Sequence, residues 1–566
     1  MTAGSARTWS FADRGIDLAK AARDGVDLLV IGGGITGAGV LRDAATRGLR
    51  ALLVEREDFA SGTSSRSSKL IHGGLRYIGE GHLAMTRESC RERDRMIQLD
   101  PDLVRPLEFL FPAYRGGKYP MWQVRSALGV YSALANFRQT ARFRTVAPAG
   151  VLERVPELRS EGLRGAGLYC DGQVDDARLV LETLKSAREL GGDAVNHAEV
   201  VEFLRGEAGR LCGARILDGF SGETIEVRAD AIVNAAGPAV ERVRGIDRPV
   251  ARPELRPAKG VHLVIPRDRV RAATAVTFEA SDGRQVFLVP WDDVALIGTT
   301  DTFSDEIDRP TVSIDEVHYL LDAANLAFPG ACLTTNDLSS VYAGVRPLAA
   351  ASDDEIPSTK VSREHRIYED PSGLLSVVGG KLTTHRLMGK RIVDRVVRAL
   401  PAGRAATFGP SRTVDLPLRP ALPEWRDAEA ELSERYGIEP RQSRYLVRSY
   451  GARAADLLAE AAPGDLRPIG GSRNLFAEIP WSFRTECPAT LCDLLERRLG
   501  MAIFAVGQGL AELPAIAEAA ARVAGWDEER THAESMAYVD SVRRRYQIVA
   551  SAAPARKATA SSRSAA

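Results

Sequence analysis

Residues 27–37 read Asp-Leu-Leu-Val-Ile-Gly-Gly-Gly-Ile-Thr-Gly, an apolar segment that runs directly into a glycine-rich turn. The apolar part is typical of a buried parallel strand, and a helix that ends at Gly48 follows the turn. In such a turn Gly32 permits the tight bend, Gly34 lets the backbone approach a pyrophosphate, and Gly37 lets the helix pack closely against the sheet. The start of the helix would then face the phosphates of a nucleotide.

A second strand and an acidic residue follow at the spacing of a dinucleotide-binding βαβ unit. Residues 51–54 read Ala-Leu-Leu-Val, and Glu55 stands where a carboxylate accepts hydrogen bonds from the adenosine ribose. A glycine motif alone is weak evidence, but the two strands, the helix and the acid together predict a site for FAD or NAD. The competing interpretation is an ordinary glycine-rich turn between a strand and a helix.

Length and composition limit the class of protein. A chain of 566 residues is too long for a single core, so about two to four domains are expected. The 75 basic and 75 acidic residues cancel, which argues against nucleic acid as the main partner because such binding needs a concentrated basic surface. The six cysteines are scattered without a CxxC motif, which predicts reduced thiols in the cytosol and neither a zinc site nor a disulfide framework.

The two ends of the chain are expected to lie outside the domains. Residues 1–24 lack the basic start and apolar core of a secretory signal and read as a short helical lead-in. The longest apolar stretch, residues 501–526, is interrupted by polar and charged side chains, which argues against a membrane-spanning helix. Residues 547–566 are rich in alanine and serine and are expected to be a disordered tail.

Two later segments extend the nucleotide-binding domain. The first contains a helix, a strand, a hairpin and a buried strand with a glycine turn, at residues 174–191, 198–201, 211–227 and 229–238. The second, residues 374–384, again reads as strand, glycine turn and helix start, although such a turn is as often purely structural. If functional, its amides and Lys381 would suit the carbonyl edge of a flavin. The domain is expected to comprise residues 25–80, 170–240 and 340–400.

The remaining segments predict two further units and an α/β fold class. Strand-rich stretches at residues 260–266, 286–290 and 295–300 suggest an antiparallel sheet inserted into the first domain as a cap, formed by residues 81–169 and 241–339. A separate helical domain is expected over residues 410–546. Its predicted helices cover residues 426–436, 441–450, 454–461 and 489–499.

Several motifs, in their order and spacing, resemble the family of FAD-dependent, aerobic glycerol-3-phosphate dehydrogenases. They are IGGGITGAG at 31–39, ASGTSSRSSKLIHGGLRY at 60–77, VDDAR at 174–178, VNAAGP at 233–238, IGTTD at 297–301, GVRPL at 344–348, GGKLTT at 379–384 and EIPWSFR at 478–484. One departure is Ala239, where the family usually has tryptophan, and we expect it to change packing rather than chemistry. The resemblance implies a glutathione-reductase-like FAD-binding Rossmann domain that oxidises sn-glycerol 3-phosphate to dihydroxyacetone phosphate.

The resemblance also implies roles for individual residues. It places His262 at the substrate as catalytic base or hydroxyl-orienting group, although a lone histidine is more often a structural hydrogen-bonding residue. It places Arg346 near the reacting carbon, where a cation would stabilise the developing oxyanion. Arg76 and Arg363 fall at phosphate contacts, where guanidinium groups bind anions through paired hydrogen bonds. Tyr77 and Thr300 are expected to add hydrogen bonds to the substrate.

The residues expected to bind FAD come from the motifs and from the resemblance. FAD is expected to be held non-covalently, because no histidine or cysteine attachment motif is evident. The expected contacts are Gly32, Gly34, Gly37, Glu55, Thr63, Ser64, Ser65, Lys69, His72, Val200, Gly237, Gly380, Lys381, Leu382 and Thr383.

Three alternatives remain open from the sequence. An oxidase would pass electrons to oxygen instead of a membrane quinone, an amine-oxidising enzyme of the same fold would take an amino acid, and a non-catalytic FAD- or NAD-binding module would not be reduced by substrate. The quinone hypothesis predicts a cytoplasmic enzyme peripherally associated with the inner face of the cell membrane. Residues 121–146, which mix aromatic and basic side chains, are the candidate amphipathic docking helix, or else a helix packed on the cap. Whether the chain forms a homodimer stays open.

Overall fold

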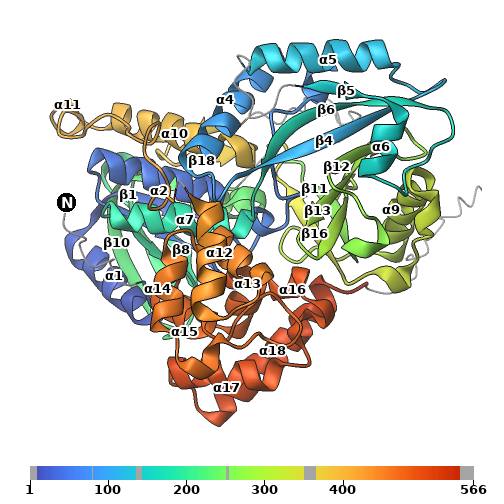
Figure 1. Cartoon of the computed structure of the whole chain (residues 1–566). Helices are drawn as coiled ribbons and strands as arrows, with labels where there is room; N and C mark the ends of the chain where they lie inside the picture. The colour runs from blue at the N-terminus through green and yellow to red at the C-terminus, as the bar shows by residue number, and fades with distance from the viewer. Residues whose placement is uncertain are drawn as a thin grey trace, which may run out of the picture.

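The computed structural model describes residues 9–79, 81–135, 143–249, 254–349, 365–422 and 424–548. Two sheets lie side by side, and the helices of the C-terminal domain lie against both of them in the lower part of Figure 1. The expected lead-in contains helix α1 (Phe11–Asp24). Residues 1–8 and 549–566, which include most of the expected disordered tail, lie outside the described residues.

The first sheet is the core of the predicted nucleotide-binding domain. Its path runs in the order β17, β18, β10, β1, β2, β7, with parallel pairing from β18 to β7 and an antiparallel edge strand, and β8 and β9 extend it. The strands are β1 (Val26–Ile31), β2 (Ala51–Val54), β7 (Asp193–Val195), β8 (Ala198–Arg205), β9 (Leu211–Asp218), β10 (Thr224–Asn234), β17 (Arg366–Glu369) and β18 (Leu375–Val378). Helices α2 (Ile35–Arg47), α7 (Asp176–Glu189) and α10 (His385–Ala399) belong to this domain. Every residue of β1 and β2 is buried, as their apolar composition predicts.

The hairpin predicted after residue 211 is present, but its second strand continues further than expected. β10 pairs antiparallel with β9 in its first half and parallel with β1 in its second half. The separate strand predicted at residues 229–234 is therefore the second half of β10.

The second sheet is the predicted cap. Its path runs in the order β15, β11, β14, β13, β12, β4, β6, β3, with β16 added to β11 and β5 to β6, and all pairs except β4 with β12 are antiparallel. Its strands are β3 (Leu70–Ile71), β4 (Arg105–Tyr114), β5 (Arg144–Val146), β6 (Leu163–Gln173), β11 (Ala258–Pro266), β12 (Ala275–Glu279), β13 (Gln285–Trp291), β14 (Val294–Gly298), β15 (Thr302–Phe303) and β16 (Ser340–Arg346). β3 and β16 were expected in the nucleotide-binding domain, but their backbone hydrogen bonds place them in this sheet.

The C-terminal domain is helical, as predicted, and shares a core with the cap. One hydrophobic cluster contains cap side chains such as Trp291 and Tyr342 together with Leu494 and Ile516 of the C-terminal domain. Its helices are α12 (Trp425–Tyr436), α13 (Pro440–Tyr450), α14 (Arg453–Glu460), α15 (Glu478–Thr485), α16 (Met501–Phe504), α17 (Leu513–Ala524) and α18 (Glu528–Arg545). The helix predicted at residues 489–499 is a π-helical turn, Asp493–Arg498.

The remaining helices connect or cover these units. They are α3 (Arg76–Gly79), α4 (Leu83–Leu99), α5 (Met121–Leu134), α6 (Pro148–Arg154), α8 (Val240–Asp247), α9 (Ile314–Ala327) and α11 (Ala402–Ala405). On α5, Leu128 and Tyr131 are fully buried whereas Trp122 is 66% exposed. This helix ends at Leu134, earlier than the predicted docking segment, and residues 136–142 of that segment lie outside the described residues. No helix among the described residues has the length and apolarity needed to cross a membrane.

Helices α2 and α10 approach each other closely because glycines face each other at their crossing. A Cβ added at Gly389 would overlap the Gly39 carbonyl group, and one added at Gly39 would lie 2.8 Å from the His385 carbonyl oxygen. This contact brings the segment that precedes α10 toward the glycine turn that precedes α2.

We expect the substitution Gly389→Ala to destabilise the protein by about 1–3 kcal/mol, because the added methyl group forces the two helices apart. The matched control is Gly245→Ala in α8, where an added Cβ meets nothing within 4 Å. That change should be neutral or stabilising by up to about 1 kcal/mol. Calorimetric melting of both variants measures the difference, and equal melting temperatures would contradict the proposed close packing.

Candidate active site

A cavity of about 870 Å³ is lined by residues of both sheets. From the first sheet come the turn after β1, the end of β2, the start of β8 and the turn after β18. From the cap come side chains of β4, β6, β11, β13 and β16. Its volume is in the range of cofactor and ligand pockets.

The glycine turn forms one end of this cavity and fits a bound pyrophosphate. Gly32, with φ +111°, adopts a conformation that favours glycine, and Gly32 and Gly34 both line the cavity. Gly37 does not line it, and an added Cβ there would overlap the Gly32 carbonyl oxygen. Its role is therefore the close packing of helix on strand, which lets the first turn of α2 reach the cavity.

Glu55 lies at the end of β2, beside this turn. Its carboxylate accepts hydrogen bonds from the backbone N–H groups of Gly33, at 2.6 Å, and Glu57, at 2.9 Å. Burial raises the pKa of Glu55, although these two N–H groups oppose the shift. Val200 lines the cavity close by, together with Ala198 and Glu199, and all three belong to the start of β8. A carboxylate with further lone pairs at this position suits the hydroxyl groups of a ribose.

The serine-rich segment, residues 61–69, was expected to contact the cofactor through four residues, and only two of them line the cavity. Thr63 and Ser64 line the cavity; Thr63 Oγ1 donates to the Val345 carbonyl, and Ser64 Oγ accepts from the Ile35 N–H at 3.0 Å. Ser65 and Lys69 do not line it. The Lys69 ammonium is 2.5 Å from Asp176 at the start of α7, a carboxylate that is fully buried and needs a positive partner.

The glycine turn after β18 reaches the same cavity, as predicted. Gly380, Lys381, Leu382 and Thr383 line it together with His72. Thr383 Oγ1 accepts from the His72 N–H at 3.1 Å and donates to the His72 carbonyl at 3.2 Å, which joins the two segments. A short 3₁₀ turn, Leu382–Thr384, leads into α10. On the other side Gly237 and Ala239 line the cavity within one turn, so Ala239 occupies a wall position.

His262 lies on the cap side and is almost completely buried. Its Nε2 shares a hydrogen bond of 2.8 Å with Ser68 Oγ, and its ring stacks on Tyr342 with 4.8 Å between centroids. Nδ1 has no hydrogen-bond partner among the described residues. Burial, together with the positive charges of Arg346 and Lys69, lowers the pKa of His262 to about 3. The imidazole is therefore neutral at physiological pH.

Arg346, at the end of β16, lines the cavity next to His262. It donates to Thr299 Oγ1 at 2.9 Å and to the Thr300 carbonyl and an Asp301 carboxylate oxygen at 3.3 Å each. Gly260 leaves room for it, since an added Cβ would overlap the guanidinium. The Thr300 side chain does not line the cavity, because its Oγ1 accepts from the Val261 N–H at 3.0 Å. Thr300 therefore holds Arg346 through its carbonyl, and its side chain does not reach the cavity, contrary to the prediction of a substrate contact.

Arg76 and Tyr77 line the cavity near the glycine turn that follows β18. The Arg76 guanidinium lies 5.6 Å from the centre of the Tyr77 ring, and the Lys381 ammonium lies 4.0 Å from the same ring. Two cationic side chains therefore flank one aromatic ring, an arrangement typical of cation–π contacts. Arg363 lies outside the described residues.

The structure adds site residues that the sequence did not single out. Ser68 and Tyr342 fix the His262 ring, and Tyr342 is the antiparallel neighbour of His262 across β11 and β16. Arg66 lines the cavity, and its Nη1 is a buried nitrogen without a hydrogen-bond partner in the described part of the chain. An aromatic wall is formed by Phe109, Tyr169 and Phe287. Ser68 and Arg66 belong to the serine-rich segment, and only their contacts in the folded chain distinguish them from the neighbouring residues.

Comparison with known proteins agrees with this geometry. The FAD dependent oxidoreductase family matches residues 27–395, and the C-terminal domain of alpha-glycerophosphate oxidase matches residues 411–531. The chain is 35% identical over 490 residues to the aerobic glycerol-3-phosphate dehydrogenase of Staphylococcus aureus, an alignment that covers 85% of this chain and 88% of the relative.

Solved structures show the same relationship. The glycerol-3-phosphate dehydrogenase of Bacillus halodurans in complex with FAD aligns with a TM-score of 0.77 and 31% identity, covering 94% of this chain and 98% of that one. The L-alpha-glycerophosphate oxidase of Mycoplasma pneumoniae aligns with a TM-score of 0.52 and 17% identity over 70% of this chain and 99% of that one, which shows a shared fold. FAD is the cofactor of the matched family, and the glycine turns, Glu55 and the size of the cavity fit it. The chain therefore belongs to the family of FAD-dependent glycerol-3-phosphate dehydrogenases.

Proposed function

We propose that the protein oxidises sn-glycerol 3-phosphate to dihydroxyacetone phosphate. The observation that carries the proposal is that His262 and Arg346, from adjacent cap strands, line the same cavity as the two glycine turns. FAD supplies the acceptor for the hydride. The names of the similar dehydrogenases support this choice of substrate.

His262 is proposed to orient the secondary hydroxyl group and to take its proton. It is neutral, its ring is fixed by Ser68 and Tyr342, and Nδ1 is without a partner among the described residues. The low pKa makes it a weak base before substrate binds. An anionic substrate in the cavity would offset the charge of Arg346, which raises the basicity of the ring when a proton has to be accepted.

Arg346 is proposed to stabilise the negative charge that develops on the substrate oxygen. Its three hydrogen bonds hold the guanidinium in place before reaction, so little reorganisation is needed when charge develops. The proposal assigns Thr299, Thr300 and Asp301 to positioning this arginine.

Arg76 and Arg363 are proposed to bind the phosphate group, with Tyr77 beside them. A phosphate dianion held by charge-assisted hydrogen bonds explains selection of the phosphorylated triol over glycerol. The positions of Arg76 and Tyr77 on the cavity wall support this role. Arg363 is assigned by the family resemblance alone.

A second candidate is a glycerol-3-phosphate oxidase, in which oxygen reoxidises the flavin. The match of residues 411–531 to the C-terminal domain of alpha-glycerophosphate oxidase favours it. The flavin and substrate sites would be nearly the same in both enzymes. We favour the dehydrogenase, with a membrane quinone as acceptor, because of the overall similarity to aerobic dehydrogenases.

We expect anaerobic addition of glycerol 3-phosphate to bleach the visible absorption band of the protein-bound FAD, because the substrate delivers a hydride to it. Glycerol, which lacks the phosphate, and glycine, a substrate for the amine-oxidising alternative, are the control ligands. Stopped-flow absorbance measures the rate. Bleaching by glycine but not by glycerol 3-phosphate would overturn the proposed substrate class, and no bleaching by any substrate would favour a non-catalytic module.

We expect His262→Gln to lower kcat by about 10²–10⁴ while FAD stays bound, since it removes the proton acceptor. His318→Gln, which changes an exposed histidine of α9, should leave kcat unchanged. Because the pKa of His262 is lowered to about 3, the ring carries no proton above pH 5, and it should add no ionisation to kcat/KM near pH 6.5.

The substrate phosphate, with a second pKa of about 6, contributes a limb of its own to that profile. This limb must be the same in wild type and in His262→Gln. An acid limb near pH 6.5 that disappears only in His262→Gln would contradict a neutral His262 in the free enzyme.

The proposal also includes peripheral association with the inner face of the cell membrane, where a quinone accepts the electrons. The chain acts there alone or as a homodimer. The outer side of α5 carries the exposed Trp122 and Val130 next to Arg125, a mixture suited to anionic headgroups. The buried Leu128 and Tyr131 show that the opposite side of this helix packs on the protein, so any docking uses its outer side alone.

We expect the protein to float with anionic vesicles at low salt, to be released at high salt, and to reduce a short-chain quinone faster than oxygen. Trp122→Ser should weaken flotation without changing flavin bleaching by glycerol 3-phosphate. Vesicle flotation and quinone reduction are the measurements. If the protein stays unbound at both salt concentrations and oxygen reoxidises the flavin as fast as the quinone, the oxidase replaces the dehydrogenase.

A further inference from the structure

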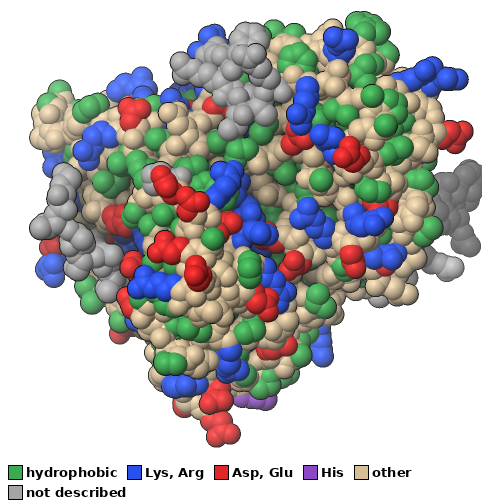
Figure 2. Space-filling view, in the orientation of Figure 1, with side chains coloured by type: hydrophobic (Ala, Val, Ile, Leu, Met, Phe, Trp, Pro, Cys, Tyr) green, Lys and Arg blue, Asp and Glu red, His purple; other side chains and the backbone are tan. Residues whose placement is uncertain are grey.

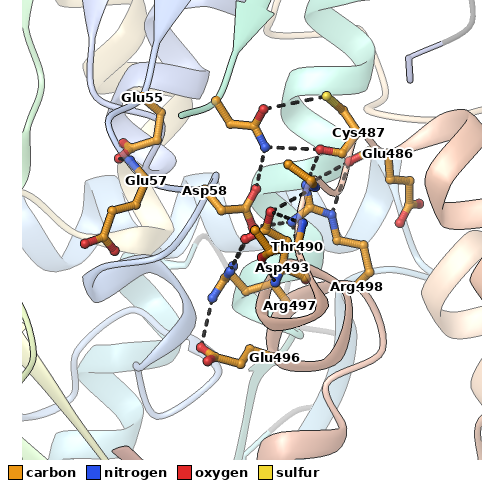
Figure 3. Close-up of polar contacts among 12 residues, drawn as sticks. Glu55, Glu57, Asp58, Glu486, Cys487, Thr490, Asp493, Glu496, Arg497 and Arg498 are labelled. Atoms are coloured by element: carbon orange, nitrogen blue, oxygen red, sulfur yellow. Dashed lines mark hydrogen bonds and ion pairs between the residues drawn. The ribbon is translucent and has the colours of Figure 1, made fainter. Parts of the chain in front are cut away.

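The π-helical turn Asp493–Arg498 directs charged side chains of the C-terminal domain into the nucleotide-binding domain. In Figure 3, Asp493, Arg497 and Arg498 lie close to Asp58, and Glu496 lies below them, joined to Arg497. All four side chains are at least nine-tenths buried. π-helical turns occur often at functional sites. None of the four lines the cavity, so any effect on it must act through other residues.

Asp58 is one of the residues through which the two domains contact each other. Its Oδ2 accepts a hydrogen bond from Arg497 Nε at 2.5 Å and another from Arg498 Nη1, and its Oδ1 accepts from Asn196 Nδ2 at 2.9 Å. Asp58 is 1% exposed. A buried carboxylate with this set of donors is firmly held, because loss of a donor would leave charge uncompensated in the interior.

The neighbouring His197 is held by the same turn. Its Nε2 lies 2.9 Å from an Asp493 carboxylate oxygen, and Arg497 donates to the other Asp493 oxygen at 2.8 Å. Asp58, His197 and Asp493 have the spacing of metal ligands. Arg497 bridges the two carboxylates, however, so a guanidinium supplies the positive charge that a metal ion would bring.

Asp58 and His197 belong to the two segments that surround Glu55, at the end of the cavity that suits the adenosine ribose. The backbone of Glu55 donates to the Val195 carbonyl at 2.9 Å, and the N–H groups of Ala198 and His197 donate to the carbonyls of Glu55 and Glu57 at 2.7 Å each. Glu55, Glu57 and Ala198 all line the cavity. These hydrogen bonds connect the π-helical turn, through Asp58 and His197, to the backbone of Glu55.

The same turn reaches a second segment of the cavity wall. Glu496 lies 3.6 Å from Arg66 Nη2 and accepts from Tyr546 Oη at 3.0 Å, while the Arg66 guanidinium lies 5.1 Å from the centre of the Tyr546 ring. Arg66 lines the cavity. The C-terminal domain therefore contacts the segment after β2 at two places, at Asp58 and at Arg66.

We propose that the C-terminal domain clamps FAD indirectly, and that Asp58, Arg497 and Arg498 are positioning residues that hold the Glu55 segment against the adenosine half of the cofactor. The proposal rests on FAD as the cofactor and not on the identity of the substrate. Failure of the substrate proposal would therefore leave it intact.

The first test compares FAD with FMN, which lacks the adenosine half, in equilibrium binding to the deflavinated full-length chain. Asp58→Asn and Arg497→Gln should weaken FAD binding at least tenfold and FMN binding little, so that the ratio of the two affinities falls. Arg497→Lys should restore part of that ratio. A general loss of stability would instead weaken both ligands together.

The matched control is Arg453→Gln. Arg453 makes interdomain hydrogen bonds to Glu182 at 2.8 Å and Glu189 at 2.7 Å, but these glutamates belong to α7 and do not line the cavity. This variant should leave the ratio unchanged. An unchanged ratio in Asp58→Asn and Arg497→Gln, or an equal fall in Arg453→Gln, would overturn the proposal.

The second test needs no variant. Coupling between two sites is reciprocal, so FAD must stabilise the turn if the turn stabilises FAD. Hydrogen exchange of the wild-type chain should slow in residues 490–498 as well as in residues 55–60 when FAD binds. Slowing confined to residues 55–60 would overturn the clamp even if the variants failed to fold.

Discussion

The close contact of α2 with β1, which requires glycine at position 37, is the constraint on which the cofactor site depends. A side chain at that position would overlap the Gly32 carbonyl and push the helix away from the turn. With glycine there, the first turn of α2 begins at the cavity, where the start of a helix suits a phosphate group. The facing glycines of α2 and α10 then bring the second glycine turn to the same place. Close backbone contacts at these glycines thus position both glycine turns of the site.

The cap adds side-chain chemistry to this backbone frame. Gly260 and His262 lie two residues apart on β11 and so point to one face of the sheet, where Gly260 makes room for Arg346 of the adjacent strand. Burial, reinforced by the positive charges of Arg346 and Lys69, keeps the imidazole neutral, and Arg346 lines the same cavity as the imidazole. On the face shown in Figure 2, basic and acidic side chains are mixed.

Buried ion pairs join the C-terminal domain to the rest of the molecule. Such pairs add little to stability, because removing charges from water offsets much of their attraction, but they fix relative positions strongly. Asp58, held by two arginines, and Arg178, which donates to Glu486, are examples at this interface. This geometry suits a domain that orders the cofactor segments without touching the cavity.

The sequence by itself determined the nucleotide-binding unit, because a strand, a glycine turn, a helix and Glu55 are local features with fixed spacing. It also determined the helical C-terminal domain and the antiparallel cap, since periodicity reports which face of an element is buried. It did not determine that β16 joins the cap sheet, because strand pairing depends on partners far away in the chain. Neither did it show that Lys69 and Thr300 turn away from the cavity: Lys69 pairs with Asp176, and Thr300 accepts from the Val261 backbone. Only the tertiary structure decided that Ser68 and Tyr342 hold His262 and that Arg497 and Arg498 reach Asp58, because these contacts join residues from separate segments of the chain.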